Sequence, residues 1–133
     1  MHLFTVDQAN RTLPLVRKIV EDVVREHRRW REAVVELDLL GSPTAPGLPD
    51  PRMTDIEARI RKSTREMDSF QAELESLGIQ LKDRHIGLID FPSELEGQPV
   101  LLCWQLGEPS VQFWHGVDSG FAGRQPLSPT LVG

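Results

Sequence analysis

The stretch that decides the fold is Gly41-Ser42-Pro43-Thr44-Ala45-Pro46-Gly47-Leu48-Pro49-Asp50-Pro51. Its four prolines and two glycines cannot continue a helix, so the segment predicts a loop. On both sides of it, apolar residues recur at alternating spacings of three and four, which is typical of one face of a helix. We therefore expect the chain to reverse direction here and to form a long antiparallel two-helix hairpin over residues 5–78.

The first helix is predicted to begin at a capping box of Thr5 and Gln8, and Pro14 is expected to kink or interrupt it near residues 11–13. Its seam, the stripe that should face the second helix, comprises Leu13, Val16, Val20, Val23, His27, Trp30, Val34 and Leu37. A second apolar face comprises Ile19, Val24, Val35 and Leu39. A hairpin rarely buries two such faces by itself, so we expect one to pack on the rest of the chain or on a second copy.

The second helix is predicted over residues 52–77, with Gly78 as its C-terminal cap. Its seam comprises Met53, Ile56, Ile60, Ser63, Met67, Phe70, Leu74 and Leu77. Folding the chain at the loop places the two polar interruptions, His27 and Ser63, in one layer. We expect a hydrogen bond between them, because a buried polar group needs a partner. The alternatives are a functional histidine at this position, or a His27 that points to solvent.

After Gly78 the apolar period changes from that of a helix to that of a strand. β-type runs occupy residues 79–82, 86–91, 100–106 and 110–115, with turn signals at residues 96–98 and 107–109. The sequence therefore predicts a single α+β domain over residues 1–133. It should consist of the hairpin at 5–78, a small antiparallel β-meander of three to four strands at 79–116, and a C-terminal loop and tail at 117–133 that frays beyond Leu127.

The charge of the chain excludes some functions. It holds 15 basic and 20 acidic side chains and carries a net charge of −5, with no basic stripe. Nucleic-acid binding depends on neutralising phosphates, so we expect none. No apolar stretch approaches the roughly 20 residues that a membrane helix needs. A single cysteine, Cys103, and an N-terminus without a signal-peptide pattern favour the cytoplasm.

The candidate site lies in the β-region and the loop that follows it. The candidate ligands of a divalent metal are Asp90, His115 and Asp118. A histidine with two carboxylates can bind such a metal ion, or it can act as a general base with an orienting acid. The candidates for binding another ligand are Trp104, Glu108, Trp114 and Arg124. However, the spacing of these residues matches no standard metal motif, and the hairpin turn separates Glu108 from His115. No cofactor is predicted.

Each of these residues also has a purely structural interpretation. Glu108 would stabilise its turn, Asp90 would cap a backbone donor, and His115 would hydrogen-bond the following loop. Arg124 would pair with Asp118, Asp90 or Glu94, or else anchor an anionic ligand. Cys103 would be a buried, inert thiol, and Trp104 and Trp114 would pack in the core.

Several motifs resemble those of an uncharacterised bacterial family, DUF2203. They are Phe4-Thr-Val-Asp-Gln-Ala-Asn10, Leu13-Pro14, Leu81-Lys-Asp83, Gly87-Leu-Ile-Asp-Phe-Pro92, Leu102-Cys-Trp104, Gly107-Glu-Pro109, Trp114-His115 and Gly120-Phe-Ala-Gly-Arg-Gln-Pro126. The resemblance covers almost the whole chain outside the 41–51 loop. It implies a small, cytoplasmic, bacterial protein with a helical hairpin, and it implies no reaction.

Taken together, the sequence favours a non-enzymatic structural or protein-interaction module. Its helical hairpin would associate with a second copy, as a homo-oligomer, or with another protein partner. The alternative is a small metal- or ligand-binding protein, or an enzyme, with its site in the β-region and C-terminal loop around His115.

Overall fold

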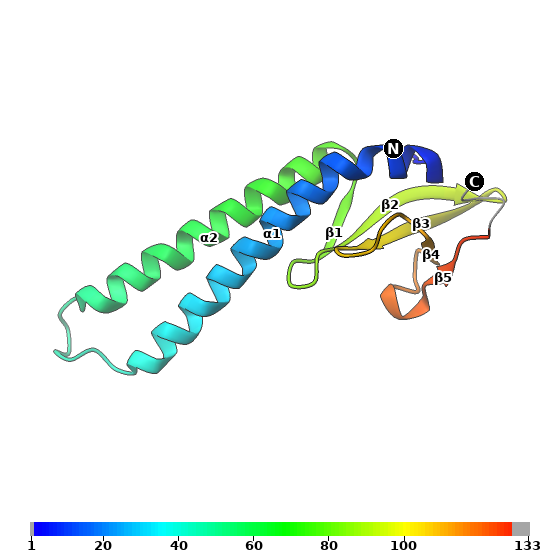
Figure 1. Ribbon diagram of the computed structural model, residues 1–133. Helices are drawn as coiled ribbons and strands as arrows, with labels where there is room; N and C mark the ends of the chain where they lie inside the picture. The colour runs from blue at the N-terminus through cyan, green and yellow to red at the C-terminus, as the bar shows by residue number, and fades with distance from the viewer. Residues whose placement is uncertain (1, 129–133) are drawn as a thin grey trace.

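The computed structural model describes residues 2–128, which form two long helices and a five-stranded sheet (Figure 1). The elements are α1 (Val6–Leu40), α2 (Pro51–Ser76), β1 (Gln80–Asp83), β2 (Leu88–Leu95), β3 (Gln98–Gln105), β4 (Phe113–Gly116), the short 3₁₀ helix η1 (Phe121–Gly123) and β5 (Gln125–Pro126). The α+β class and the two-helix hairpin are confirmed. No helix within residues 2–128 combines the length and the apolar character needed to cross a membrane.

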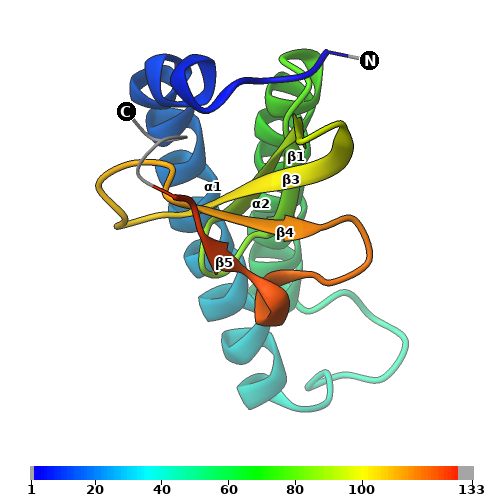
Figure 2. The same ribbon diagram turned by 90° about the vertical axis from the view of Figure 1, so that its right-hand side faces the viewer.

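The ends of the helices follow their local sequence. The Thr5 hydroxyl accepts from the Gln8 backbone N–H at 3.0 Å, and the Gln8 side chain accepts from the Thr5 backbone N–H at 3.0 Å, which is the predicted capping box. Pro14 does not interrupt α1, although the first turns of the helix lie at an angle to the rest (Figures 1 and 2). Gly78, with φ of 83°, ends the second helical segment in the left-handed conformation that glycine favours.

Asp50 caps the start of α2, a role that the sequence interpretation did not assign. Its carboxylate accepts from the backbone N–H of Arg52 at 3.0 Å and from the Arg52 guanidinium at 2.8 Å. The hydrogen bond from the Arg52 side chain is the main cause that lowers the pKa of Asp50 from 3.8 to about 2. Pro51 follows at the first helical position, where its missing N–H costs nothing.

The strands form one antiparallel sheet in the order β1-β2-β3-β4-β5. The meander is as expected, but it has five strands instead of three or four. The fifth, Gln125–Pro126, is too short to carry a detectable pattern, and it forms because the chain folds back after η1 and pairs with β4. β4 begins at Phe113, later than the predicted 110, because residues 106–112 form the connection from β3 and the backbone N–H of Val111 donates to Oδ1 of Asn10 in α1.

The two faces of the sheet have different neighbours. Side chains on one face pack against the helices and form the main hydrophobic core with Val16, Val20 and Leu74; they are Ile89, Phe91, Leu102 and Trp104. Because side chains alternate along a strand, residues 90, 103 and 115 point to the opposite face. This alternation separates the core from the polar candidates.

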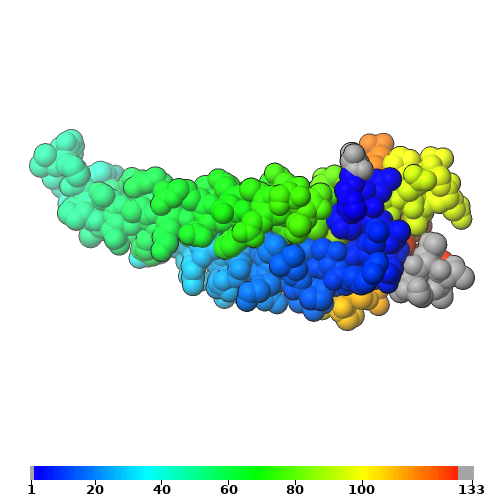
Figure 3. All heavy atoms as spheres, turned by 90° about the horizontal axis from the view of Figure 1, so that it is seen from above, coloured from blue at the N-terminus to red at the C-terminus, as the bar shows by residue number. Residues whose placement is uncertain are grey.

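The sheet covers only part of the hairpin (Figure 2). The hydrophobic core draws its residues from 4–20 and 74–127, and we call this part of the molecule the head. Residues 28–66, which we call the distal hairpin, project from the head as a narrow arm (Figure 3). In the distal hairpin, four residues are buried: Ala33, Asp50, Ile56 and Ser63.

The predicted hydrogen bond between His27 and Ser63 is wrong. Ser63 is buried, but no hydrogen bond joins it to His27 in the described chain, and Nδ1 of His27 has no hydrogen-bond partner there. The His27 ring instead lies 5.4 Å from the ring of His85, in the turn between β1 and β2. Burial is the main cause that lowers the pKa of His27. Helix periodicity predicted that His27 is partly buried, but it could not identify the turn as its neighbour.

Gly87 explains how this turn approaches α1 so closely. Its φ is 71°, and a Cβ at this position would lie 2.8 Å from Cγ1 of Val20 and 3.0 Å from Cγ2 of Val24. A larger residue would therefore push the turn away from the helix. Val24, from the second apolar face of α1, is covered in this way by the turn.

Candidate functional site

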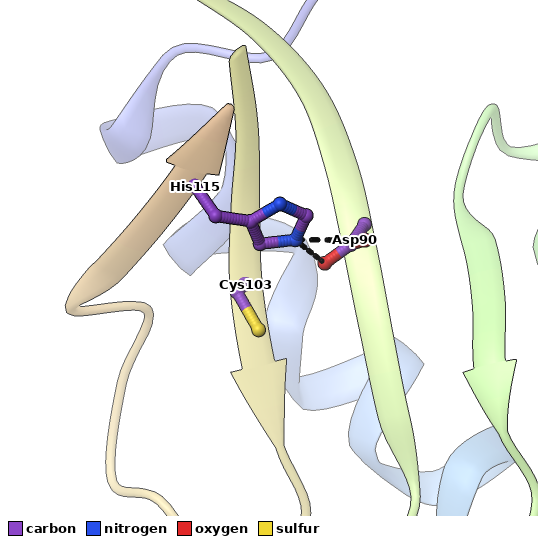
Figure 4. A group of neighbouring side chains, drawn as sticks. All are labelled: Asp90, Cys103 and His115. Carbon is purple, nitrogen blue, oxygen red and sulfur yellow. Dashed lines mark hydrogen bonds and ion pairs between the residues drawn. The ribbon is translucent and has the colours of Figure 1, made fainter. Parts of the chain in front are cut away.

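Three polar side chains meet on the face of the sheet that points away from the helices (Figure 4). Asp90 comes from β2, Cys103 from β3 and His115 from β4, and the register aligns Asp90 with Cys103 and Leu101 with His115. All three are buried, with 2%, 0% and 2% of their surfaces exposed. We call this set the buried cluster.

The imidazole of His115 is held from both sides. Its Nε2 lies 3.0 and 3.1 Å from the two carboxylate oxygens of Asp90, and its Nδ1 lies 2.8 Å from the backbone carbonyl of Gly116. A carbonyl oxygen only accepts, so Nδ1 must carry a hydrogen and donate it. Nε2 then faces the carboxylate, and a hydrogen bond between these two groups requires one further proton that they share.

Cys103 completes the buried cluster. The Sγ atom, a carboxylate oxygen of Asp90 and a ring nitrogen of His115 all lie within 4.8 Å of one another. Burial, followed by the negative charge of Asp90, raises the pKa of the Cys103 thiol to about 12. Cys103 is therefore a neutral thiol at neutral pH and a poor nucleophile.

Arg124 and Glu108 form a second polar pair. The Arg124 guanidinium donates to Oε2 of Glu108 at 2.6 Å and lies 3.8 Å from the ring centre of Phe113 and 4.9 Å from that of Phe121. Glu108 also accepts from the backbone N–H of Gln105 at 2.7 Å, so its predicted role in the turn is confirmed.

The predicted pairing of Arg124 with Asp118, Asp90 or Glu94 is wrong, because the chain after η1 brings Arg124 back across β4 to the turn that holds Glu108.

The structure brings together only some of the candidates. Asp90 and His115 meet, whereas Asp118 lies exposed in a turn outside the buried cluster. Trp104 and Trp114 lie on the helix-facing side, where Trp104 is fully buried and Trp114 is half-buried against the core. Trp104 donates through Nε1 to the carbonyl of Glu108 at 3.0 Å. The tryptophans therefore belong to the core side of the sheet.

The interpretation of Asp90 as a cap for a backbone donor is wrong, because its carboxylate faces His115. His115 does hydrogen-bond the start of the following loop, as expected.

Cys103 is the member of the buried cluster that sequence reasoning missed. A signal for it was present, because a tight turn centred on Glu96 and Gly97 aligns residue 90 with residue 103 in the two flanking strands. Once Asp90 is a candidate, this register makes Cys103 its neighbour.

The comparisons with known proteins concern the chain as a whole. Residues 2–127 match the family described as "Uncharacterized conserved protein (DUF2203)". The chain belongs to the DUF2203 family. The resemblance expected from the sequence motifs is thereby confirmed. No curated protein and no solved structure matched this DUF2203 chain.

Proposed function

We propose that this DUF2203 protein is an interaction module that associates with a second copy of itself through the distal hairpin. The observation that carries the proposal is the exposure of large apolar side chains there. Val35 is 54% exposed, Leu39 is 80% exposed and Leu48 in the loop is 66% exposed. Val34, next to Val35, is also exposed.

These residues belong to an apolar face that is covered elsewhere. Val24 lies about three turns before Val35 on the same face of α1, and it packs against the core of the head. Val35 and Leu39, further along the same face, extend beyond the sheet and contact solvent. Val35 and Leu39 are four residues apart, so their side chains are neighbours on the helix surface. An exposed apolar surface of this kind is typical of a protein–protein contact, so we expect a protein partner to cover Val35 and Leu39 as the head covers the start of the same face.

The charge of the distal hairpin favours a second copy as this partner. Residues 28–66 carry eight basic and seven acidic side chains, whereas the whole chain carries 15 and 20. The excess negative charge therefore lies outside the distal hairpin. Two copies that meet through their distal hairpins bring together nearly neutral surfaces and keep their acidic heads apart.

The expected assembly is a symmetric dimer in which two hairpins pack as four helices. A two-fold axis places the same surface of each copy in the contact, so the exposed apolar side chains of both copies are covered in the same way. The helices of two distal hairpins are long enough to pack side by side over several turns, as helices do in four-helix bundles. The interaction uses exposed side chains of the distal hairpin, whereas the buried cluster in the head is closed to solvent.

The test is the mass of the protein in solution, measured by sedimentation or light scattering over a range of concentrations. We expect a dimer for the unaltered chain. Burying one apolar side chain stabilises by about 1.5–3 kcal/mol, so the double variant Val35→Glu/Leu39→Glu should weaken the dimer by more than about a hundredfold.

The matched control is Leu15→Glu. Leu15 is 56% exposed, an exposed fraction similar to the 54% of Val35, but it lies in the part of α1 that belongs to the head. It should leave the dimer intact. An unaltered chain that stays monomeric at all concentrations, or a Leu15→Glu variant that dissociates as readily as the double variant, would contradict the proposal.

The proposed cellular location is the cytoplasm. Its support is the single cysteine, which cannot form an internal disulfide and is buried as a free thiol.

A further inference from the structure

We propose that Asp90, Cys103 and His115 bind one divalent transition-metal ion of the zinc class. The three side chains project from three adjacent strands into one buried space and present one oxygen, one sulfur and one nitrogen to each other (Figure 4). This function is separate from self-association, because the buried cluster lies in the head and the proposed dimer contact lies in the distal hairpin.

The orientation of His115 supports this site. A histidine that binds a metal usually donates its other ring N–H to a backbone carbonyl or a carboxylate, which fixes the tautomer and aims the free nitrogen. Here Nδ1 donates to the Gly116 carbonyl at 2.8 Å, and Nε2 points at the other two members of the buried cluster. The histidine is therefore already in the orientation that metal binding requires.

The donor atoms and their spacing fit a zinc-like ion. Thiolate sulfur, imidazole nitrogen and carboxylate oxygen bind zinc at about 2.0–2.3 Å, so neighbouring ligands of a tetrahedral centre lie about 3.3–3.8 Å apart. The three donor atoms here lie within 4.8 Å of one another. Small side-chain shifts therefore bring all three to one ion, with the second carboxylate oxygen of Asp90 as a further donor.

The balance of charge also fits. One thiolate and one carboxylate neutralise a divalent cation, and the imidazole binds as a neutral ligand. Binding then releases two protons, namely the proton shared by Asp90 and His115 and the thiol proton of Cys103. The nearby charges of Arg124 and Glu108 cancel in their own ion pair at 2.6 Å. With the ion bound, the buried site therefore carries no net charge.

Within the described residues, Asp90 has few other partners. No lysine or arginine of residues 2–128 forms an ion pair with it; its partners are His115, at 3.0 and 3.1 Å, and the thiol of Cys103. A carboxylate can accept about four hydrogen bonds, so a buried one with so few donors retains capacity for a cation.

The test is metal binding by the unaltered, tag-free chain after treatment with a chelator. Titration with Co²⁺ should reach one ion per chain and produce a thiolate-to-cobalt charge-transfer band together with the visible spectrum of a tetrahedral centre. Addition of Zn²⁺ should remove both signals. The band identifies the ligand, because Cys103 is the only cysteine in the chain.

Two variants and two controls locate the site. Cys103→Ser should abolish the charge-transfer band, and Asp90→Asn should weaken binding by at least about tenfold, because an amide is a poor zinc ligand. Asn at this position still hydrogen-bonds a neutral imidazole, so the variant is expected to stay folded. Asp118→Asn and His85→Gln change exposed residues outside the buried cluster and should bind like the unaltered chain.

The double variant Val35→Glu/Leu39→Glu should also bind one ion, which separates the failure of this proposal from the failure of the dimer. If saturating Co²⁺ gives no charge-transfer band with the unaltered chain, the proposal is overturned. Binding without the band, or binding that Cys103→Ser leaves unchanged, is an adventitious ion only and overturns it as well.

Discussion

The head and the distal hairpin are built from the same two helices but differ in what covers them. In the head, the sheet buries the helices, and Val16, Val20 and Leu74 are fully enclosed. In the distal hairpin, the second apolar face of α1 extends beyond the sheet, and Val35 and Leu39 on that face are exposed. Helix periodicity therefore gives the position of an apolar face and leaves the identity of its partner open. The head has its partner within the chain, and we propose that the distal hairpin finds it in a second copy.

The largest effect that can test this comparison is expected in the buried cluster of the head. Asp90→Ala leaves the His115 imidazole buried beside an empty space, and removing one partner of a buried pair costs about 3–5 kcal/mol. Asp118→Ala, which alters an exposed carboxylate, should change the free energy of unfolding by less than about 0.5 kcal/mol. Urea unfolding of both variants measures the difference. Equal stabilities for the two would show that the cluster does not hold the head together.

The next effect compares one leucine from each region. Leu74 is fully buried in the core, so Leu74→Ala should reduce the free energy of unfolding by about 2–5 kcal/mol. Leu39 is exposed in the monomer, and Leu39→Ala should cost less than about 0.5 kcal/mol when unfolding is measured at a concentration where the protein is monomeric. At higher concentration, Leu39→Ala should become measurably destabilising, because the dimer then contributes to stability. A large loss from Leu39→Ala in the monomer would contradict the division into two regions.

The smallest effect is a pH dependence at the start of α2. Folding lowers the pKa of Asp50 from 3.8 to about 2, so this carboxylate stabilises the folded state above about pH 4 and loses that contribution as the pH falls toward 2. Asp50→Asn keeps a capping side chain but removes the ion pair with Arg52. The melting temperature of the unaltered chain should therefore exceed that of Asp50→Asn above pH 4, and the difference should vanish near pH 2. A difference that stays constant across this range would rule out the ion pair as its cause.

Most of the architecture could be predicted from the sequence. The proline-rich loop at 41–51 determines the hairpin, and the change of period after Gly78 determines the meander. Local signals of this kind depend only on residues close together in the sequence, so the structures they form can be predicted without knowledge of the tertiary fold. The capping box of Thr5 and Gln8 is of the same type, and the structure forms it as expected.

The features that escaped prediction depend on contacts between distant segments. His27 packs against a turn 58 residues away, and Arg124 reaches Glu108 only because the chain folds back after η1. Asp90 and His115 are candidates from the sequence, but the separation of Asp118 from them depends on the register of three strands and the turn after β4. The sequence predicts Cys103 as a buried, inert thiol, and its burial and raised pKa agree with this; its position beside Asp90 depends on the strand register.

The most direct measurement of the central claim is hydrogen–deuterium exchange of the unaltered chain at low and high protein concentration. If the distal hairpin is the surface where two copies meet, raising the concentration should slow exchange in peptides from residues 28–66 and leave the strands of the head unchanged. The double variant Val35→Glu/Leu39→Glu should show no such dependence. Slower exchange confined to the head, or the same exchange at every concentration throughout the chain, would contradict the account.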